Sequence, residues 1–161
     1  QAPLPARVPR LSFFFPAHNE EANLEGLVNE ALETLPTLAD TFEIIAVDDG
    51  SKDGTPALAD ALATAHPGIV RAIHHPTNLG YGAALRSGFG AAQYDLVAFT
   101  DGDRQFKIAD IARLTARLAE PDELVPAARA AQRQPARLCR ARPARRAHHR
   151  AASGRCPARP R

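Results

Sequence analysis

The stretch Leu96-Val97-Ala98-Phe99-Thr100-Asp101-Gly102-Asp103 decides how the rest of the chain is interpreted. Its apolar first half predicts a buried strand, and two carboxylates one residue apart follow the C-terminal end of that strand. Side chains at i and i+2 of an extended segment point to the same side, so Asp101 and Asp103 can converge on one cation. Two carboxylates suit Mg²⁺ or Mn²⁺, which take water and substrate phosphate as their other ligands. An isolated Asp-x-Asp is also common in solvated turns, so the preceding sequence has to decide between the two.

That preceding sequence alternates between strand and helix patterns. Continuous apolar runs predict strands over residues 11–15, 42–47, 69–73 and 96–99. Apolar residues at helical spacing predict helices over about residues 20–35, 54–65, 82–93 and 108–118. Pro16 should end the first strand and Pro36 the first helix. Asn19 and Asp53 are the expected N-caps of the first two helices.

The alternation predicts an α/β layered fold with a largely parallel sheet. In such sheets, ligands bind outside the carboxyl ends of the strands. Asp48 and Asp49 follow the second predicted strand, and Asp101 and Asp103 follow the fourth. Both acidic segments therefore lie where a site is expected.

Charge divides the 161 residues into two unlike parts. Residues 1–125 hold 9 Lys and Arg and all 18 Asp and Glu, whereas residues 126–161 hold 11 Arg and no acidic residue. Cys139 and Cys156 lack the spacing of a zinc site or a disulfide framework. No apolar run approaches the roughly 20 residues of a membrane span, and the start lacks the apolar core of a signal peptide. The chain has no Met, so we expect that Gln1 is not its natural start.

Four segments in register resemble the family 2 glycosyltransferases with the GT-A fold. They are residues 16–21, 47–55, 78–84 and 101–103. The likeness is to the branch that includes dolichol-phosphate mannose synthases and bacterial polyprenyl-phosphate glycosyltransferases, and it covers about residues 8–125. It implies a three-layer α/β GT-A sheet of which residues 10–125 form the N-terminal, nucleotide-sugar-binding half, after an irregular lead-in over residues 1–9.

The resemblance also implies a set of nucleotide-sugar-binding residues. Asp49 matches the carboxylate that accepts hydrogen bonds from the base, and a carboxylate suits an N–H edge such as that of uracil or guanine. Asp101 and Asp103 match the ligands of the Mg²⁺ or Mn²⁺ ion that bridges the diphosphate. The full set is Pro16, Ala17, Glu20, Asp48, Asp49, Gly80, Arg86, Asp101 and Asp103.

Several of these residues have a competing interpretation. Asp48 either belongs to the site or braces the turn that follows it. Arg86 either approaches the diphosphate or is a solvated helix charge, and His18 lies either near the base or in a solvated loop. The glycine-rich run over residues 78–88 is not a dinucleotide fingerprint, because Leu85 occupies the third glycine position and the run follows the third strand.

The family's reaction moves a hexose from a UDP- or GDP-linked sugar to an acceptor, with inversion. We expect polyprenyl phosphate as the acceptor and the cytoplasmic membrane face as the location, with no nucleic-acid partner. Acceptor-binding and catalytic residues belong to the C-terminal half of the family's domain, which is missing here. We therefore expect a truncated chain with little or no transfer activity.

Two other classes stay open. A nucleotidyltransferase also uses paired carboxylates on an α/β sheet, but it would release pyrophosphate from a nucleoside triphosphate. A non-enzymatic protein would use its basic tail to bind nucleic acid or a membrane surface, and that binding would be salt-sensitive.

The basic tail, residues 126–161, contains 11 Arg, 11 Ala and 5 Pro and one large aliphatic residue, Leu138. Such a composition cannot bury enough apolar surface to offset the entropy of ordering, so we expect disorder. Either this is a genuine basic arm or, as we prefer, an out-of-frame translation of a GC-rich gene. The encoding DNA distinguishes the two, because only the second requires an alternative frame that restores the strand and helix pattern.

Overall fold

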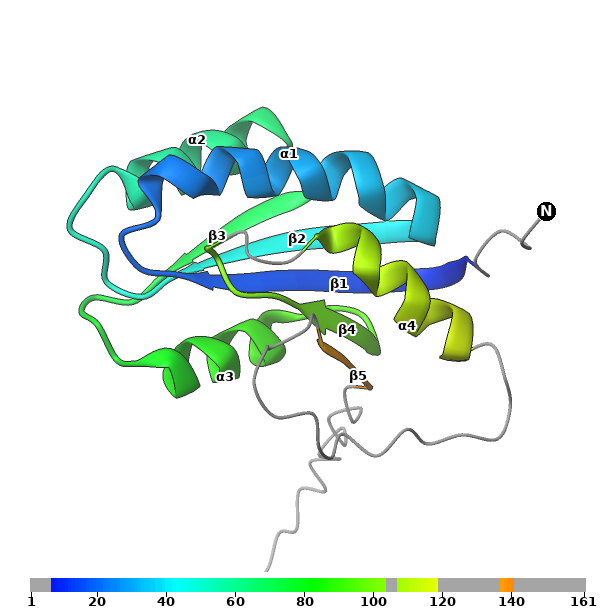
Figure 1. The fold of residues 1–161 in the computed structure, drawn as a ribbon. Coiled ribbons are helices and arrows are strands. Elements are labelled where there is room, and N and C mark those ends of the chain that lie inside the picture. Colours follow the sequence, from blue (N-terminus) through cyan, green and yellow to red (C-terminus); the bar gives the residue numbers. More distant parts are fainter. Residues whose placement is uncertain (1–6, 104–106, 119–136, 141–161) are drawn as a thin grey trace, which may run out of the picture.

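A computed structural model describes residues 7–103, 107–118 and 137–140 and shows an α/β fold around one sheet (Figure 1). Four strands run parallel: β1 (Val8–Ala17), β2 (Ala39–Asp48), β3 (Val70–His74) and β4 (Leu96–Phe99). A fifth strand, β5 (Arg137–Arg140), pairs antiparallel with β4, and the order is β3-β2-β1-β4-β5. The helical segments are α1 (Glu21–Leu38), α2 (Thr55–Ala65), α3 (Tyr81–Ala91), a 3₁₀ turn (Ile108–Asp110) and α4 (Ile111–Leu118).

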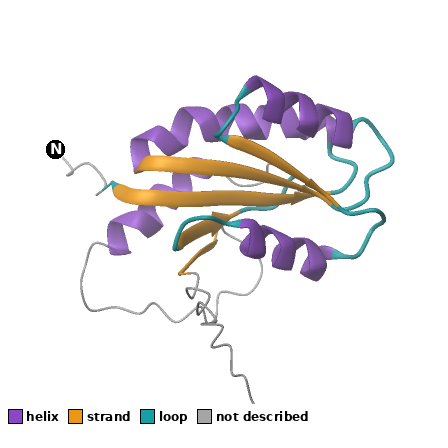
Figure 2. Ribbon diagram, turned by 180° about the vertical axis from the view of Figure 1, so that it is seen from behind, coloured by secondary structure: helices purple, strands orange, loops and turns teal. Residues whose placement is uncertain are grey.

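Helices cover both faces of the sheet, with α1 and α2 on one side and α3 on the other (Figures 1 and 2). β1 lies between β2 and β4, and its side chains alternate between the two cores. Phe13 and Phe15 pack with α1 in one cluster, whereas Phe14 packs on the α3 side. There the Phe14 ring stacks on Phe99 at a centroid distance of 5.3 Å and meets Phe89 edge-on at 5.0 Å. Burial on both faces explains the unbroken apolar run of β1.

Two proline predictions are wrong. Pro36 lies inside α1 rather than ending it, and the helix continues because Leu35 and Leu38 are both buried in the core. Pro16 lies inside β1, which pairs with β2 as far as Ala17. Pairing of β1 with β4 ends at Phe14, so the missing N–H of Pro16 removes no hydrogen bond from the ladder on that side.

The prediction that Asn19 caps α1 is also wrong. Asn19 has a left-handed φ of 55°, and its side-chain oxygen accepts a hydrogen bond from the Lys52 N–H at 2.9 Å. The N–H groups at the start of α1 bond instead to the loop before α2 and to the first residue of α2. The Glu20 N–H donates to the Thr55 hydroxyl at 2.9 Å, and the Glu21 N–H donates to Asp53 at 3.3 Å. Asp53 thus contacts both helices, although the residue before α2 is Gly54.

A buried carboxylate ties three strands to the end of α3. Glu43 of β2 accepts hydrogen bonds from the Ser12 hydroxyl of β1 and from the Gln93 N–H, both at 2.6 Å. Arg71 of β3 forms an ion pair with Glu43 at 2.6 Å and also donates to the Ala91 carbonyl at 2.6 Å. Because the Glu43 side chain is 4% exposed, these contacts offset its loss of hydration.

The expectation of a disordered tail does not hold for Arg137–Arg140, which form β5. Backbone pairing explains the strand, since the free edge of β4 offers hydrogen-bonding groups to any extended segment. The other residues of 126–161, and residues 1–6, 104–106 and 119–125, lie outside the described residues. The tail's disorder and its reading frame therefore stay predictions. None of the helices in the described ranges combines the length and apolar character that a membrane crossing requires.

Candidate functional site

The carboxyl ends of β1, β2 and β4 and the start of α3 enclose a cavity of about 280 Å³. Six of the nine predicted site residues line it: Pro16, Ala17, Glu20, Asp49, Asp101 and Asp103. His18, Asn78, Tyr81, Ala84 and Gly102 complete the lining. Asp49 of the first acidic segment and Asp101 and Asp103 of the second thus line the same cavity. Asp48 lies at a neighbouring cavity of about 670 Å³, and Gly80 and Arg86 line neither of the two.

The ends of β1 and β4 approach each other at Gly102. A Cβ atom at this position would lie 2.6 Å from the Pro16 carbonyl oxygen, too close for any other residue without a backbone shift. The glycine between Asp101 and Asp103 therefore serves the contact between two backbone segments. This contact holds the paired carboxylates against the loop that follows β1.

The paired carboxylates differ in their surroundings. Asp103 is exposed, whereas Asp101 is half-buried and accepts a hydrogen bond from the Tyr81 hydroxyl at 2.9 Å. Within the described ranges, no group of three or more His, Cys, Asp or Glu side chains could hold a metal ion. Two carboxylates are what Mg²⁺ or Mn²⁺ takes from protein when substrate phosphate and water supply the remaining ligands. Asp101 and Asp103 therefore fit such an ion, and they do not fit a closed site made of protein ligands.

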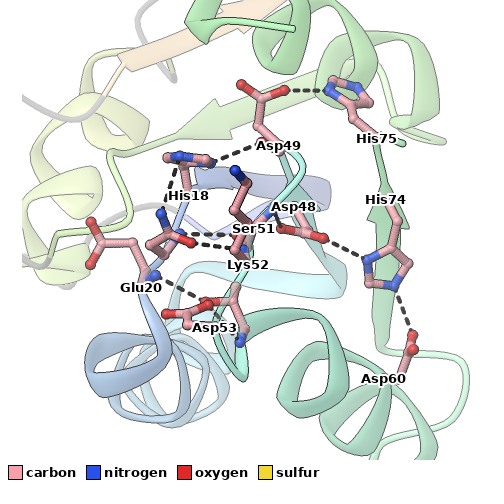
Figure 3. Close-up of polar contacts among 12 residues, drawn as sticks. His18, Glu20, Asp48, Asp49, Ser51, Lys52, Asp53, Asp60, His74 and His75 are labelled. Carbon is pink, nitrogen blue, oxygen red and sulfur yellow. Dashed lines mark hydrogen bonds and ion pairs between the residues drawn. The ribbon is translucent and has the colours of Figure 1, made fainter. Parts of the chain in front are cut away.

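Asp49 is buried and already holds three donors, of which Figure 3 shows His75. Its Oδ1 accepts from the His75 Nδ1–H at 2.7 Å and from the Leu79 N–H at 2.9 Å. Its Oδ2 accepts from the Gly80 N–H at 3.0 Å. Burial alone would raise the pKa of Asp49, but these hydrogen bonds outweigh it and lower the pKa. A carboxylate has about four acceptor positions, so one position on Oδ2 is left among the described contacts.

His75 continues this network to α3. Its Nε2 lies 2.7 Å from the Ser87 hydroxyl, so Asp49, His75 and Ser87 form a chain of acid, base and hydroxyl. Ser87 lies within α3 and lines neither cavity. The arrangement therefore braces the loop after β3 against α3 and does not form a nucleophilic site. Sequence reasoning missed His75, although its position directly after a strand was a usable signal.

Asp48 braces the turn that follows it, which was one of its two interpretations. Its Oδ1 accepts from the Ser51 N–H at 3.0 Å, and its Oδ2 lies 3.0 Å from His74 Nδ1. Burial alone would raise the pKa of Asp48, but the bonds from Ser51 and His74 lower it. The other ring nitrogen of His74 lies 2.9 Å from Asp60 of α2 (Figure 3). Both carboxylates only accept, so the two contacts favour the charged form of the ring, which carries two N–H groups.

The hydrogen bonds to Asp48 and then to Asp60 accordingly raise the pKa of His74. Because the two carboxylates lie on β2 and α2, the charged ring clamps these elements together at the end of β3. No local sequence pattern indicated this clamp, because Asp48, Asp60 and His74 lie on three different elements.

The remaining predicted residues contribute in different ways. Gly80 has a φ of 94° and precedes α3, where its N–H donates to Asp49. Arg86 is exposed, and its guanidinium lies near Gly82 on the same helix. His18 lines both cavities, and its Nδ1–H donates to the Asp49 carbonyl at 2.9 Å. Contacts of Gly80 and Arg86 with a diphosphate, and of His18 with a base, stay predictions.

The fold and this crevice define the class of protein. Parallel strands with helices on both faces and paired carboxylates at the strand ends form an α/β fold of the GT-A type. The chain belongs to glycosyl transferase family 2, whose family model matches residues 12–153.

Similar proteins are longer than this chain. Glycosyltransferase AglD of Haloferax volcanii is 40% identical over 95 residues, which are 58% of this chain and 15% of AglD. An undecaprenyl-phosphate 4-deoxy-4-formamido-L-arabinose transferase of Pseudomonas aeruginosa is 35% identical over 126 residues, 78% of this chain and 37% of that protein. A mannosyltransferase from Pyrobaculum calidifontis, solved with GDP-Man and Mn²⁺, has a TM-score of 0.62 at 27% identity, covering 74% of this chain and 35% of that one. The chain thus spans well under half the length of each.

Proposed function

We propose that this chain carries the donor-binding part of a glycosyltransferase that moves a hexose from a UDP- or GDP-linked sugar to a polyprenyl phosphate. The observation that carries the proposal is the cavity at the strand ends, which brings Glu20, Asp49, Asp101 and Asp103 together. Two similar proteins support it. The Pseudomonas relative is named for an undecaprenyl-phosphate acceptor, and the Pyrobaculum mannosyltransferase was solved with GDP-Man and Mn²⁺.

In this proposal each wall of the cavity binds one part of the donor. Pro16, Ala17 and Glu20 take the base and ribose, and the remaining acceptor position of Asp49 takes an N–H of the base. Asp101 and Asp103 hold Mg²⁺ or Mn²⁺, which would stabilise the negative charge that develops on the departing nucleoside diphosphate. The lowered pKa of Asp49 keeps it ionised and therefore an acceptor at neutral pH.

The acceptor determines what further groups the reaction needs. A phosphate acceptor is already an anion, so the enzyme has to position it rather than deprotonate it. We assign no residue to this task, because the described residues that match the family's motifs all serve the donor. The acceptor class makes the cytoplasmic membrane face the proposed place of reaction. For the 161 residues alone, we expect weak metal-dependent nucleotide binding without measurable transfer.

Calorimetric titration of the purified chain with UDP-glucose, GDP-mannose and ATP tests the proposal. We expect binding of a sugar nucleotide that requires Mn²⁺ and is lost in Asp103→Asn. Asp110→Asn, the same change at an exposed acid outside the cavity, is the matched control and should bind normally. Preference for ATP with release of pyrophosphate would instead identify a nucleotidyltransferase. Binding that ignores Asp103 would contradict the proposed site.

A further inference from the structure

We infer that Tyr81 is a positioning residue for the metal-binding carboxylate of Asp101, and that buried Asp49 sets Tyr81 in place. This inference rests on the proposed function, since it assigns Asp101 to a metal ion. It gives Asp49 a second task beside base recognition. It also means that the glycine-rich segment before α3 affects Asp101, on the other side of the cavity, through the position of Tyr81.

The direct contact is a hydrogen bond from the Tyr81 hydroxyl to Asp101 Oδ1 at 2.9 Å. Tyr81 is the first residue of α3, and Asp101 follows β4, so the bond joins two separate elements across the cavity that both residues line. Tyr81 is 48% exposed. Burial in the core therefore contributes little to its position, and the hydrogen bond of its hydroxyl ties the ring to Asp101.

Asp49 determines where α3 begins. The N–H groups of Leu79 and Gly80 both donate to this carboxylate, at 2.9 and 3.0 Å. The Gly80 carbonyl then accepts the first helical hydrogen bonds, from Ala83 and Ala84, each at 3.1 Å. Tyr81 directly follows Gly80, whose N–H is bonded to the buried carboxylate of Asp49. Asp49 therefore determines where the backbone of Tyr81 lies.

His75 makes that anchor rigid. It donates to Asp49 Oδ1 at 2.7 Å and its other nitrogen lies 2.7 Å from Ser87 of α3. His75, in the loop after β3, thus fixes the Asp49 carboxylate, and this carboxylate in turn fixes the start of α3. Hydrogen bonds thus join His75 to Asp49 and Asp49 to the Leu79–Gly80 backbone; the covalent backbone leads on to Tyr81, whose hydroxyl bonds Asp101.

The consequence for Asp101 is a fixed side-chain orientation before metal arrives. The Tyr81 bond occupies Oδ1, and among the described residues Oδ2 accepts no hydrogen bond. One oxygen is therefore restrained while the other is available to an ion. Outer groups that orient a metal ligand in this way reduce the entropy lost on binding and typically improve metal affinity about 10- to 100-fold.

The first test measures Mn²⁺ binding, with free Mn²⁺ read by electron paramagnetic resonance. We expect Tyr81→Phe to raise the Mn²⁺ dissociation constant about tenfold, the lower end for loss of such an orienting bond. Tyr94→Phe is the matched control and should bind as the unsubstituted chain does. Tyr94 precedes β4, at the opposite end of that strand from Asp101, where it lies against Arg10.

The second test reads Tyr81 directly. The chain has two tyrosines and no tryptophan, so the Tyr94→Phe variant emits from Tyr81 alone. A carboxylate that accepts a hydrogen bond from a phenol quenches its emission, so Mg²⁺ binding at Asp101 should change that emission with the occupancy of the site. In the Tyr81→Phe variant only Tyr94 emits, and this emission should not change when Mg²⁺ is added. A tyrosine whose hydroxyl did not bond the metal-binding carboxylate would give no metal-dependent signal, and the affinity of Tyr81→Phe then decides whether that bond positions Asp101.

Asp103→Ala separates failure of this inference from failure of the proposed function. If the unsubstituted chain binds no Mn²⁺, or if Asp103→Ala binds it equally well, the proposed metal site is wrong and this inference falls with it. If Asp103→Ala loses Mn²⁺ while Tyr81→Phe retains full affinity and Tyr81 emission ignores Mg²⁺, the proposed function survives and the role of Tyr81 is refuted.

Discussion

Replacing Asp49 by asparagine exchanges one oxygen for an NH₂ group of nearly equal size and so tests the anchor without creating a cavity. Three donors converge on this carboxylate: the His75 ring and the backbone N–H groups of Leu79 and Gly80. A single amide oxygen can accept two of them. The third donor, the Gly80 N–H, then faces the NH₂ group and keeps only its second acceptor, Asn78 Oδ1 at 2.9 Å.

The expected loss of stability follows from the number of hydrogen bonds that Asp49→Asn removes or weakens. A hydrogen bond to a charged group contributes about 1.5–3 kcal/mol, and the two hydrogen bonds that remain lose the strength that the charge of Asp49 supplied. We expect Asp49→Asn to lower the free energy of unfolding by about 3 kcal/mol, a large part of the roughly 5–15 kcal/mol that a domain possesses. The start of α3 should loosen, so Mn²⁺ affinity should fall as it does in Tyr81→Phe.

Urea unfolding at pH 7, followed by circular dichroism, measures the first effect. Asp53→Asn is the control, because Asp53 also accepts two backbone N–H groups but lies at the surface. Asparagine serves as well as aspartate at such a helix start, so Asp53→Asn should leave the free energy of unfolding nearly unchanged. Equal losses in the two variants would refute the claim that Asp49 anchors the loop from a buried position.

Three further comparisons test the fold around the site. Glu43→Gln breaks a buried ion pair and should lower the free energy of unfolding by about 3 kcal/mol. Asp40→Asn breaks an exposed ion pair on the same strand and should lower it by under about 1 kcal/mol. Similar urea midpoints for the two variants would contradict this. Gly50→Ala should be far more destabilising in urea than Gly68→Ala, because both have left-handed φ but only Gly50 would drive a Cβ into neighbouring backbone. Unfolding free energies measured across pH test the raised pKa of His74. The clamp stabilises the fold fully below pH 6.5, the ordinary pKa of histidine, and this contribution is lost as the pH rises through the raised pKa of the folded state. The free energy of unfolding of His74→Gln should therefore decline less over this range.

The strands and the position of the cavity could be predicted because local patterns determine them. The apolar runs of β1, β2 and β4 are dictated by burial on both faces, and acidic residues directly after β2 and β4 had to meet at one edge of a parallel sheet. The predicted bounds erred where tertiary contacts overrode a local rule. Pro36 stays within α1 because the residues around it are buried.

The contacts within the site could not be predicted in the same way. The partners of Asp49 come from the loop after β3 and the start of α3, and the clamp on Asp48 involves His74 and α2. No spacing rule joins residues on separate loops, because their proximity depends on how each loop closes. The sequence therefore indicated which carboxylates face the cavity, whereas the role of His75 and the bond from Tyr81 required the structure.

The most direct test of the proposed donor site is a map of backbone amide shifts by nuclear magnetic resonance while Mg²⁺ and UDP-glucose or GDP-mannose are added to the ¹⁵N-labelled chain. The account predicts that the amides of Ala17, Tyr81 and Gly102, around the smaller cavity, shift with the sugar nucleotide, and that Asp103→Asn abolishes the change. Shifts confined to Ser51 and Thr77, at the neighbouring larger cavity, or shifts that persist in Asp103→Asn, would contradict it.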